Sequence, residues 1–465
     1  MKNMTIYNIA KACKGRLCGD KGNSAEAACV VIDSRKMEKG GVFIATRGER
    51  VDGHDFIGQA VEAGALAIVC EREPEDCGVP YILVEDSFQA LKEIAEFYRT
   101  QLSIPVIGIT GSVGKTSTKE MIASVVSEGF RVLKTEGNFN NEIGLPLTVL
   151  QIRPEHEAAV LEMGISDFGE MHRLSRIARP DICVITNIGQ CHLENLGTRE
   201  GILKAKSEIF DFMNPQGHIF VNGDDDMLIK IKAKGSHEPV HFGLDPSNEV
   251  FASGVMNKGL LGSEAVIHMD LEVFPVEIPL PGAHMIYNAL AAAAVGKCMG
   301  LSSLQIQKGI GRVQAVGGRS HVISLPSRTI IDDCYNANPV SMKAAIDLLM
   351  MALGRKAAVL GDMFELGHKE KEMHGEIGAY AVKKGVDVLI CTGELSRAMY
   401  ESACEEQQRQ TGRNKTEIYY FKTREEMLGQ LEKILHPGDS ILVKASHGME
   451  FEKVIEFLKG VSPKS

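Results

Sequence analysis

The chain has 465 residues, of which 51 are lysine or arginine and 61 are aspartate or glutamate, so its formal net charge is −10 at pH 7. A chain of this length holds about two to four domains, and its acidic balance argues against nucleic acid or an anionic membrane as the main partner. No run reaches the roughly 18 apolar residues of a membrane span, and residues 1–17 lack the apolar core of a secretory signal, so we expect no membrane insertion. The 11 cysteines are scattered without a C-x-x-C pair, which predicts free thiols in a soluble cytoplasmic protein.

Short runs rich in β-branched residues alternate with helical patterns along the chain, which predicts an α/β fold with largely parallel sheets. In residues 1–100 we expect strands over 30–33, 42–45, 66–70 and 81–84, and helices over 56–63 and 88–100. In residues 101–312 we expect a strand from 105, strands over 158–162, 182–188 and 218–222, helices over 115–127, 168–178, 199–213 and 287–299, and a β-rich patch over 240–280. In residues 313–465 we expect strands over 329–332, 356–360, 386–391 and 440–443, and a last helix over 450–458. No linker is rich in Pro or Ser, so the three domains should be closely joined.

Residues 105–117 form the stretch around which the chain is organised. A buried apolar strand ends in a glycine-rich turn, and Gly-Lys-Thr then opens a helix, which is typical of a phosphate-binding P-loop. Lys115 can reach the β- and γ-phosphates of a nucleotide, and Thr116 offers a hydroxyl to Mg²⁺. The predicted ATP-binding residues of this loop are Gly111, Ser112, Val113, Gly114, Lys115, Thr116 and Ser117. Only the shorter G-x-x-G-K-T spacing is met, because Ile109 stands where the longer motif has glycine. The alternative is a glycine turn that caps a helix beside an exposed lysine.

Two polar residues follow predicted strands at the sheet edge where ligands of parallel sheets bind. Glu162 comes directly after the apolar run 158–161, and a carboxylate there can hold the Mg²⁺ that the phosphates bring. His192 lies in the loop after the strand predicted over 182–188, which makes it a candidate ligand at the same edge. The alternatives are a glutamate at a solvated strand end and a histidine of the polar surface.

Lys206 lies in the middle of the apolar stripe of the helix predicted over 199–213. The stripe consists of Ile202, Leu203, Lys206, Ile209, Phe210 and Met213. Lysines are rarely buried without a partner. This lysine therefore either extends past the apolar face to solvent or meets the phosphate or metal site. At that site it would act as a cation or, after modification by CO₂, as a carbamate that ligates a metal.

Two further stretches place polar side chains beside strands. Residues 135–144 contain amides that suit a peptide or carboxylate substrate, although a plain Asx-rich turn has the same composition. The amides singled out are Asn138, Asn140 and Asn141. In the third domain, Asp333 and Tyr335 offer an acid and an aromatic ring to a ribose and an adenine, and residues 359–367 form a less specific acidic strand end. Together these residues indicate a multi-domain α/β enzyme that uses Mg²⁺ and a nucleoside triphosphate, without identifying the acceptor.

Several separate boxes, in the right order, resemble the Mur ligases, a family of ATP-dependent amide ligases of peptidoglycan synthesis. The boxes lie at residues 110–117, 138–144, 161–164, 186–192, 205–210 and 333–339, and residues 32–35 and 48–56 also fit. The resemblance covers nearly the whole chain. It implies a central P-loop-type domain with a mostly parallel sheet, flanked by an N-terminal α/β substrate domain and a C-terminal Rossmann-like domain.

The resemblance also implies roles for the matching residues. Lys115 would hold the β- and γ-phosphates, Thr116 with Glu162 would bind one Mg²⁺, and His192 with an N6-carboxylated Lys206 would serve a second ion. The implied catalytic residues are Lys115, Glu162, His192, Lys206 and Arg319. The implied ATP contacts outside the P-loop are Asn288 and Tyr335 for adenine, Asp333 for ribose and Arg319 for the γ-phosphate. The implied substrate contacts are Ser34 and Arg35 for a uridine nucleotide, and Asn138, Asn140 and Asn141 for a peptide.

The boxes at 336–339 and 361–367 favour those family members that join D-Ala-D-Ala to UDP-MurNAc-tripeptide through an acyl phosphate. Two positions depart from the family pattern, because Met285 replaces an amide and His447 replaces an arginine. The alternatives are an amino-acid-adding Mur ligase, a folylpolyglutamate synthase and, more remotely, a P-loop kinase, an ATPase or a nucleotide-binding module.

Overall fold

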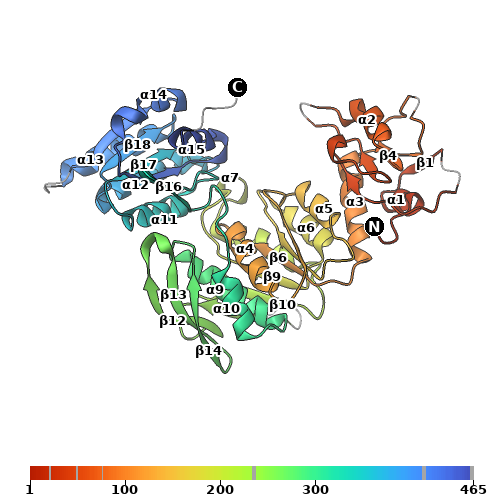
Figure 1. Cartoon of the computed structure of the whole chain (residues 1–465), viewed down its shortest axis with the longest axis horizontal. Helices are drawn as coiled ribbons and strands as arrows, with labels where there is room; N and C mark the ends of the chain where they lie inside the picture. Colours follow the sequence, from red (N-terminus) through yellow and green to blue (C-terminus); the bar gives the residue numbers. More distant parts are fainter. Residues whose placement is uncertain (20–21, 49–50, 76, 233–236, 411–414, 461–465) are drawn as a thin grey trace.

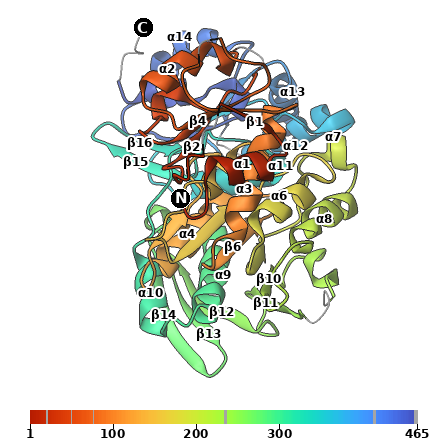
Figure 2. The same ribbon diagram turned by 90° about the vertical axis from the view of Figure 1, so that its right-hand side faces the viewer.

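The structure, a computed structural model, describes residues 1–465 except 20–21, 49–50, 76, 233–236, 411–414 and 461–465. The described residues form three β-sheets with their helices, in three parts that follow one another along the chain (Figure 1). The N-terminal part (red) and the C-terminal part (blue) both lie toward one end of the middle part, away from β12 (Val250–Asn257) and β14 (Glu272–Ile278) (Figure 2). The predicted α/β fold is confirmed, whereas the domain boundaries at residues 100 and 312 stay predictions.

The N-terminal sheet has five strands in the order β1-β5-β4-β3-β2, and only the β1–β5 pair is antiparallel. The strands are β1 (Arg16–Cys18), β2 (Val30–Val31), β3 (Val42–Ile44), β4 (Ala67–Cys70) and β5 (Tyr81–Leu83). The helices are α1 (Ile6–Ala12), α2 (Ile57–Glu62) and α3 (Ser87–Thr100), with the 3₁₀ helices η1 (Ser34–Lys36) and η2 (Gly53–Phe56). The sequence predicted neither α1 nor β1, because runs of 7 and 3 residues carry little periodicity.

The middle sheet has nine strands in the order β14-β13-β12-β11-β10-β9-β6-β8-β7. Strands from β7 to β12 pair in parallel, whereas β12, β13 and β14 pair antiparallel. The remaining strands are β6 (Val106–Thr110), β7 (Val132–Lys134), β8 (Ala158–Glu162), β9 (Ile182–Ile185), β10 (His218–Asn222), β11 (Pro239–Gly243) and β13 (Ser263–Met269). β6 is buried at every position between β8 and β9, which explains why its sequence is apolar up to Thr110. The P-loop that follows β6 therefore lies near the centre of the sheet edge.

The helices of the middle part carry the residues that surround this edge. They are α4 (Lys115–Val126), α5 (Gly144–Val149), α6 (Glu170–Ala178), α7 (Leu193–Leu196), α8 (Arg199–Ser207), α9 (His284–Cys298) and α10 (Ser303–Gly311), with η3 (Glu208–Phe210), η4 (Leu228–Lys230) and η5 (Gly259–Leu261). The single helix predicted over 199–213 is wrong in its second half, because α8 ends at Ser207 and a 3₁₀ turn follows. Ser207 Oγ donates to the carbonyl of Leu203 at 2.7 Å, and such bonds compete with the helical ladder. α9 is buried along most of its length and packs against α4, which supports the P-loop helix from behind.

The C-terminal sheet has six strands in the order β15-β16-β20-β17-β18-β19, and only the β15–β16 pair is antiparallel. The strands are β15 (His321–Leu325), β16 (Arg328–Asp332), β17 (Lys356–Gly361), β18 (Val388–Thr392), β19 (Glu417–Phe421) and β20 (Ser440–Lys444). The helices are α11 (Pro339–Met350), α12 (Glu370–Lys384), α13 (Ser396–Arg409), α14 (Arg424–Ile434) and α15 (Glu452–Leu458), with η6 (Gly367–Lys369) and η7 (His447–Met449). The Asn-Pro pair starts α11, since Asn338 and Ser341 form a capping box and Pro339 stands in the first turn.

The first two parts share one hydrophobic core. A continuous buried cluster runs from the N-terminal part through α3 into α5 and α6, and it includes Leu91 and Tyr98 as well as Leu145 and Leu174. The Tyr98 hydroxyl donates to the carbonyl of Ile152 at 2.6 Å across this junction. The C-terminal part, in contrast, has buried clusters of its own on both faces of its sheet.

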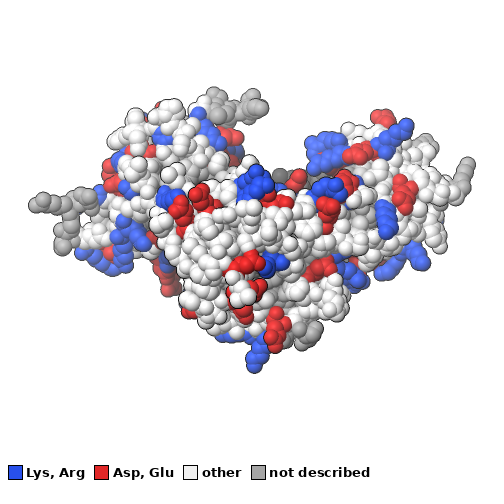
Figure 3. Space-filling model, turned by 60° about the horizontal axis from the view of Figure 1, so that its bottom comes forward, with Lys and Arg blue, Asp and Glu red and all other residues white. Residues whose placement is uncertain are grey.

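Acidic and basic side chains are interspersed on the face of the molecule shown in Figure 3. Among the described residues, no helix combines the length and apolarity of a membrane span. All eleven cysteines lie in the described part of the chain, and each is a free thiol, most of them buried.

Candidate active site

A cavity of about 690 Å³ is lined by the carboxyl edge of the middle sheet on one side and by the C-terminal part on the other. A cavity of this size is typical of small-molecule and cofactor sites. The site residues predicted from the sequence line it, with the exception of Gly111, Thr116, Lys206, Ser34 and Arg35. The first three of these belong to the P-loop or to α8, and the last two lie in the N-terminal part.

The P-loop connects β6 to α4, and two glycines allow its shape. Gly111 has a φ of +152°, and a Cβ atom there would lie 2.0 Å from Thr186 Oγ1, so no larger residue fits. Gly114, with a φ of +81°, directly precedes α4. The Asn187 side-chain oxygen accepts from the backbone N–H of Val113 at 2.9 Å and fixes the loop. The first-turn amides of an α-helix have no carbonyl of their own helix to bind, so this end of α4 can hold a phosphate.

Glu162 ends β8 with a carboxylate that is held on both oxygens. The residue is 1% exposed, Oε2 accepts from Thr116 Oγ1 at 2.7 Å, and Oε1 accepts from Asn140 Nδ2 at 2.8 Å. A hydroxyl and a carboxylate so close together fit the oxygen preference of Mg²⁺, which takes its other ligands from phosphates and water. No group of three or more His, Cys, Asp or Glu side chains that could hold a metal exists within the described ranges. The pair of Thr116 and Glu162 is thus suited to an ion that arrives with a nucleotide.

Lys206 is completely buried in α8. Its Nζ has no hydrogen-bond partner within the part of the chain that the structure describes. Burial lowers the pKa of Lys206 to about 8, with Lys115 adding to this effect and Cys191 opposing it. The alternative in which Lys206 extends past the apolar face to solvent is therefore wrong, because no part of the residue reaches the surface.

His192 contacts the C-terminal part. It precedes α7 with a φ of +52°, and its Nδ1 lies 2.7 Å from Glu365 Oε2. The assignment of His192 and Lys206 to one metal stays a prediction, and His192 Nδ1 and Lys206 Nζ both lack a hydrogen-bond partner within the described residues. Glu365 belongs to the acidic strand end at 359–367, which the sequence singled out without giving the residue a role.

Asn288 lies in α9 against the P-loop helix. Its Oδ1 accepts from Thr118 Oγ1 at 2.9 Å, and its Nδ2 lies 3.3 Å from the sulfur of Met285. Met285 is buried beside Asn288, so the residue that departs from the family pattern contacts the amide that the pattern keeps. Asn288 is thereby held in a fixed orientation at the cavity wall.

Tyr335 and Arg319 form the opposite wall in the C-terminal part. The guanidinium carbon of Arg319 lies 3.9 Å from the centroid of the Tyr335 ring, which is a cation–π contact. The centroid of the His447 ring lies 5.4 Å from the centroid of the same ring. Burial raises the pKa of Tyr335, so its ring stays neutral near pH 7. The second departure, His447, therefore joins an aromatic cluster that lines the cavity.

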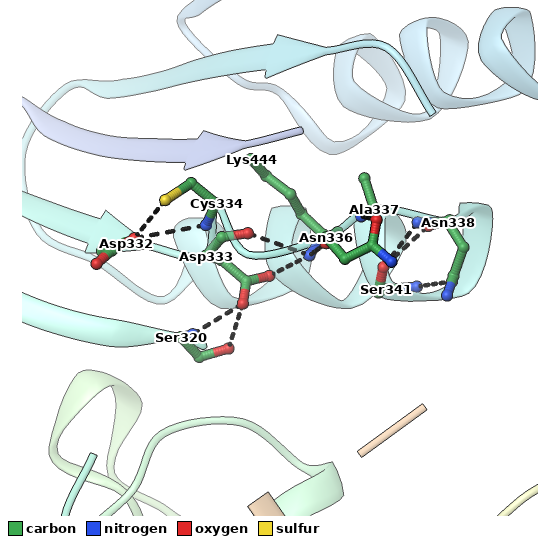
Figure 4. A network of polar contacts seen from close by, with 9 residues as sticks. All are labelled: Ser320, Asp332, Asp333, Cys334, Asn336, Ala337, Asn338, Ser341 and Lys444. Carbon is green, nitrogen blue, oxygen red and sulfur yellow. Dashed lines mark hydrogen bonds and ion pairs between the residues drawn. The ribbon is translucent and has the colours of Figure 1, made fainter. Parts of the chain in front are cut away.

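Asp333 is the centre of a polar network that the sequence revealed only in part (Figure 4). Oδ1 accepts from the backbone N–H of Ser320 at 2.8 Å, and Oδ2 lies 2.5 Å from Lys444 Nζ, which also donates to the carbonyl of Asn336 at 2.9 Å. Lys444 is 2% exposed and was missed as a site residue. It ends a buried strand, which is the signal that identified Glu162. His284 also lines this cavity, and burial lowers its pKa.

Ser34 and Arg35 lie in η1, outside the cavity between the middle and C-terminal parts. Ser34 is buried, whereas Arg35 is exposed. The next residue, Lys36, has its Nζ 6.0 Å from the ring centroid of Phe139. η1 therefore lies next to the amide-rich stretch at 138–141, which lines the cavity from the other side.

Comparison with known proteins shows which family the chain resembles. Models of three Mur ligase domains match the chain: the Mur ligase middle domain over residues 109–296, the glutamate ligase domain over 311–447 and the Mur ligase family catalytic domain over 26–99. The UDP-N-acetylmuramoyl-tripeptide–D-alanyl-D-alanine ligase of Bacillus subtilis (strain 168) is 38% identical over 467 residues, which cover 98% of this chain and 99% of the relative.

Two solved structures are similar over nearly the whole chain. MurF from Acinetobacter baumannii has a TM-score of 0.88 and 33% identity, with 98% of both chains covered. MurF ligase from Thermotoga maritima in complex with ADP has a TM-score of 0.79 and 30% identity, with 93% of this chain and 97% of that chain covered.

Proposed function

This chain belongs to the Mur ligase family, and we propose that it is an ATP-dependent ligase that joins D-alanyl-D-alanine to UDP-N-acetylmuramoyl-tripeptide in peptidoglycan synthesis. The observation that carries the proposal is the cavity at the P-loop, which the middle and C-terminal parts line together. In addition, the chain aligns from end to end with ligases of that name. The 11 free cysteines suit work in the reducing cytoplasm.

The chemistry requires activation of a carboxylate, since its carbon is a poor electrophile. The terminal carboxylate of the tripeptide attacks the γ-phosphorus of ATP, the bond from that phosphorus to the bridging oxygen breaks, and ADP leaves. The amine of the dipeptide then attacks the acyl phosphate and loses a proton, and the tetrahedral intermediate collapses to an amide and phosphate. Two anions must approach in the first step, so cations contribute most to catalysis.

Lys115 and Arg319 are the cations that we assign to the transferred phosphoryl group. Lys115 Nζ donates to the carbonyl of Gly111 at 3.0 Å and so lies back over the loop. Arg319 faces the cavity from the C-terminal part, on the Tyr335 ring. Placed on opposite walls, the two side chains would hold the γ-phosphoryl group from both sides.

Thr116 and Glu162 would hold a Mg²⁺ ion, and Asn140 would orient the carboxylate through its second oxygen. A bound Mg²⁺ neutralises charge on the β- and γ-phosphates. We propose His192 and Lys206 for a second ion. As an ammonium, Lys206 could not ligate a cation, so this assignment needs a modified side chain.

Lys206 has the properties of a lysine that reacts with CO₂. A neutral amine adds to CO₂, forming an N–C bond and releasing one proton, and the product is an anionic carbamate. The pKa of about 8 leaves a substantial neutral fraction at physiological pH, and the buried Nζ has no partner within the described residues. The carbamate would place a negative charge near Lys115 and so remove the repulsion between two cations.

The nucleoside of ATP would lie between α9 and the C-terminal part. We assign Asn288 and Tyr335 to adenine and Asp333 to the ribose, because all three line the same cavity. Lys444 holds Asp333 in place at 2.5 Å. Lys444 therefore fixes the ribose contact and brings a further positive charge to the site.

The N-terminal part would carry the acceptor substrate. We propose that residues 1–100 bind the uridine nucleotide through Ser34 and Arg35, that 101–312 bind ATP, and that 313–465 close over it. The contact of Lys36 with Phe139 supports this arrangement, because it places η1 next to the amides Asn138 and Asn141, which line the cavity. The peptide would then extend from the N-terminal part toward the P-loop.

The test is phosphate release from ATP by the purified chain with UDP-MurNAc-tripeptide, with and without D-Ala-D-Ala. We expect release to require both substrates, and mass spectrometry to find a product heavier than the tripeptide by the dipeptide minus water. A stable phosphorylated product would indicate a kinase, and release without either substrate would indicate an ATPase. Glutamate addition to a folate would indicate a folylpolyglutamate synthase.

A further inference from the structure

The cavity at the P-loop extends along the carboxyl edge of the middle sheet. The strands β6, β9, β10 and β11 are neighbours in that order. Beyond the P-loop, the cavity is lined by Thr186 after β9, Asn222 at the end of β10 and Phe242 in β11. Neighbouring strands lie about 4.8 Å apart, so three such steps take the cavity roughly 14 Å away from the P-loop. This distance leaves room for a nucleoside beyond phosphates bound at α4.

Tyr287 forms the wall of this end of the cavity from α9. It precedes Asn288, and Ala291 continues the wall one helical turn later. Asn288 stands against the P-loop, since a Cβ atom on Gly114 would lie 3.8 Å from Asn288 Oδ1. Phe242 and Ala291 are buried, whereas Tyr287 is half-buried. The lining here is therefore mostly apolar and aromatic with a few polar groups, which is typical of a cofactor site.

The position of Tyr287 is fixed by Asp224, which follows β10. The Tyr287 hydroxyl donates to Asp224 Oδ2 at 3.0 Å. Asp224 also accepts from the backbone N–H of Leu244 at 2.6 Å and from Asn248 Nδ2 at 2.9 Å, so it joins the loops after β10 and β11 to α9. Burial, together with the hydrogen bond and charge of Asp224, raises the pKa of Tyr287 to about 12. The hydroxyl thus stays a donor at neutral pH.

We propose that Tyr287 binds the purine ring of ATP, and that Asp224 is the positioning residue that holds Tyr287 in place. The inference rests on the assignment of this cavity to ATP in the proposed function. Aromatic side chains bind nucleobases by stacking, because every base has a π-face. Tyr335 lines the same cavity from the C-terminal part. The purine would then lie between one aromatic ring from each part.

The first experiment measures the binding of ADP and of pyrophosphate by calorimetry, for wild type, Tyr287→Leu and Tyr380→Leu. Pyrophosphate lacks the purine and reports on the P-loop alone. We expect Tyr287→Leu to weaken ADP binding at least about fivefold, the lower end for loss of a stacking ring, and to leave pyrophosphate binding unchanged. Wild-type ADP affinity in Tyr287→Leu overturns the proposal.

Tyr380 is a matched control for Tyr287. It is also half-buried, and its hydroxyl donates to an aspartate, Asp347, at 2.8 Å. It is not among the described residues that line the cavity. Tyr380→Leu should therefore leave both affinities at their wild-type values.

The second experiment tests whether Asp224 acts through Tyr287. Both oxygens of Asp224 accept hydrogen bonds, so the single oxygen of an amide cannot replace them. We expect Asp224→Asn to weaken ADP binding about two- to threefold, Tyr287→Phe to weaken it by a similar factor, and the double variant to be no weaker than Tyr287→Phe. An equal further loss from Asp224→Asn in the Tyr287→Phe background overturns the positioning role.

The third experiment uses the wild-type chain, so it does not depend on how the variants fold. The chain has 9 tyrosines, and in a sample with ¹³C-labelled tyrosine the signal missing from Tyr287→Phe identifies Tyr287. We expect ADP to shift this ring signal and pyrophosphate to leave it in place. An unshifted Tyr287 signal in the ADP-bound chain overturns the proposal, and this result decides if Tyr287→Leu weakens both ligands.

These readouts separate the inference from the proposed ligase activity, since neither ADP binding nor the ring signal requires ligation. A chain that shifts the Tyr287 signal with ADP but joins no dipeptide keeps the inference and contradicts the proposed function. A chain that binds pyrophosphate and ADP with equal affinity contradicts the purine contact.

Discussion

Replacing Lys206 with methionine should stabilise the free chain and abolish ligation. The amine is completely buried and has no hydrogen-bond partner among the described residues, so at pH 7 folding either buries an unpaired charge or releases a proton. The difference between a pKa of about 8 in the folded chain and 10.5 for an ordinary lysine corresponds to about 3 kcal/mol against folding. Methionine has a similar length and no charge, so Lys206→Met should remove this cost.

The stability advantage of Lys206→Met over wild type must decrease as the pH rises. Because burial lowers the pKa of Lys206, the unfolded chain binds more protons than the folded chain between pH 8 and 10.5, and wild-type stability relative to the variant rises across that window. Below pH 8 the full cost is present, and above 10.5 both states are neutral and it disappears. The advantage of the variant should therefore be about 3 kcal/mol at pH 7 and below about 1 kcal/mol at pH 10.

Urea unfolding followed by circular dichroism in CO₂-free buffer measures this difference, with Lys204→Met as the control on the exposed face of the same helix. Lys204→Met should change stability little at either pH. A Lys206→Met variant no more stable than wild type at pH 7, or equally favoured at both pH values, would refute the reasoning. Near-normal ligation by this variant would remove Lys206 from the mechanism, and added bicarbonate should not restore activity.

Three other changes test the site. Gly111→Ala should weaken ADP binding by at least about tenfold in calorimetry, because its Cβ would meet Thr186 Oγ1 at 2.0 Å; wild-type affinity would contradict the assigned loop geometry. Lys444→Met should destabilise the chain by about 3 kcal/mol in urea unfolding, because it leaves the carboxylate of Asp333 buried without its ion-pair partner. Adding Asp333→Asn should recover part of the lost stability. A Lys444→Met chain as stable as wild type would argue against the ion pair. ATP with D-Ala-D-Ala should favour a closed state with a smaller radius of gyration, and identical X-ray scattering with and without ligands would oppose that.

The parts of the fold that follow from local sequence were predicted well. β6 is apolar up to Thr110 and β8 up to Glu162 because both faces of each strand are buried, and a strand of that kind is visible in the sequence. The helix over 199–213 was extended too far, since periodicity does not show that Ser207 bonds back to Leu203. β1 could not be found, because its three residues form a strand only by pairing with β5.

The candidate site was predictable where a charged residue ends a buried strand. This rule found Glu162, and applied evenly it would also have found Lys444 at the end of β20. The bond from Asn140 to Glu162 was not predictable, because it joins a loop to a strand 22 residues away. The contact between His192 and Glu365 depends on the docking of two separate sheets, for which no local pattern exists.

The buried cluster that passes through α3 has a mechanical consequence for the cycle. Tyr98 bonds to Ile152, and Arg99 donates to the carbonyl of Ala178 at 2.8 Å, so the N-terminal and middle parts are fastened together as one rigid platform. The C-terminal part has buried clusters of its own, so it can rotate relative to this platform without disrupting the platform's core. We therefore expect the UDP-linked peptide to keep its place on this platform within a turnover, while movement of the C-terminal part alone admits ATP and releases ADP.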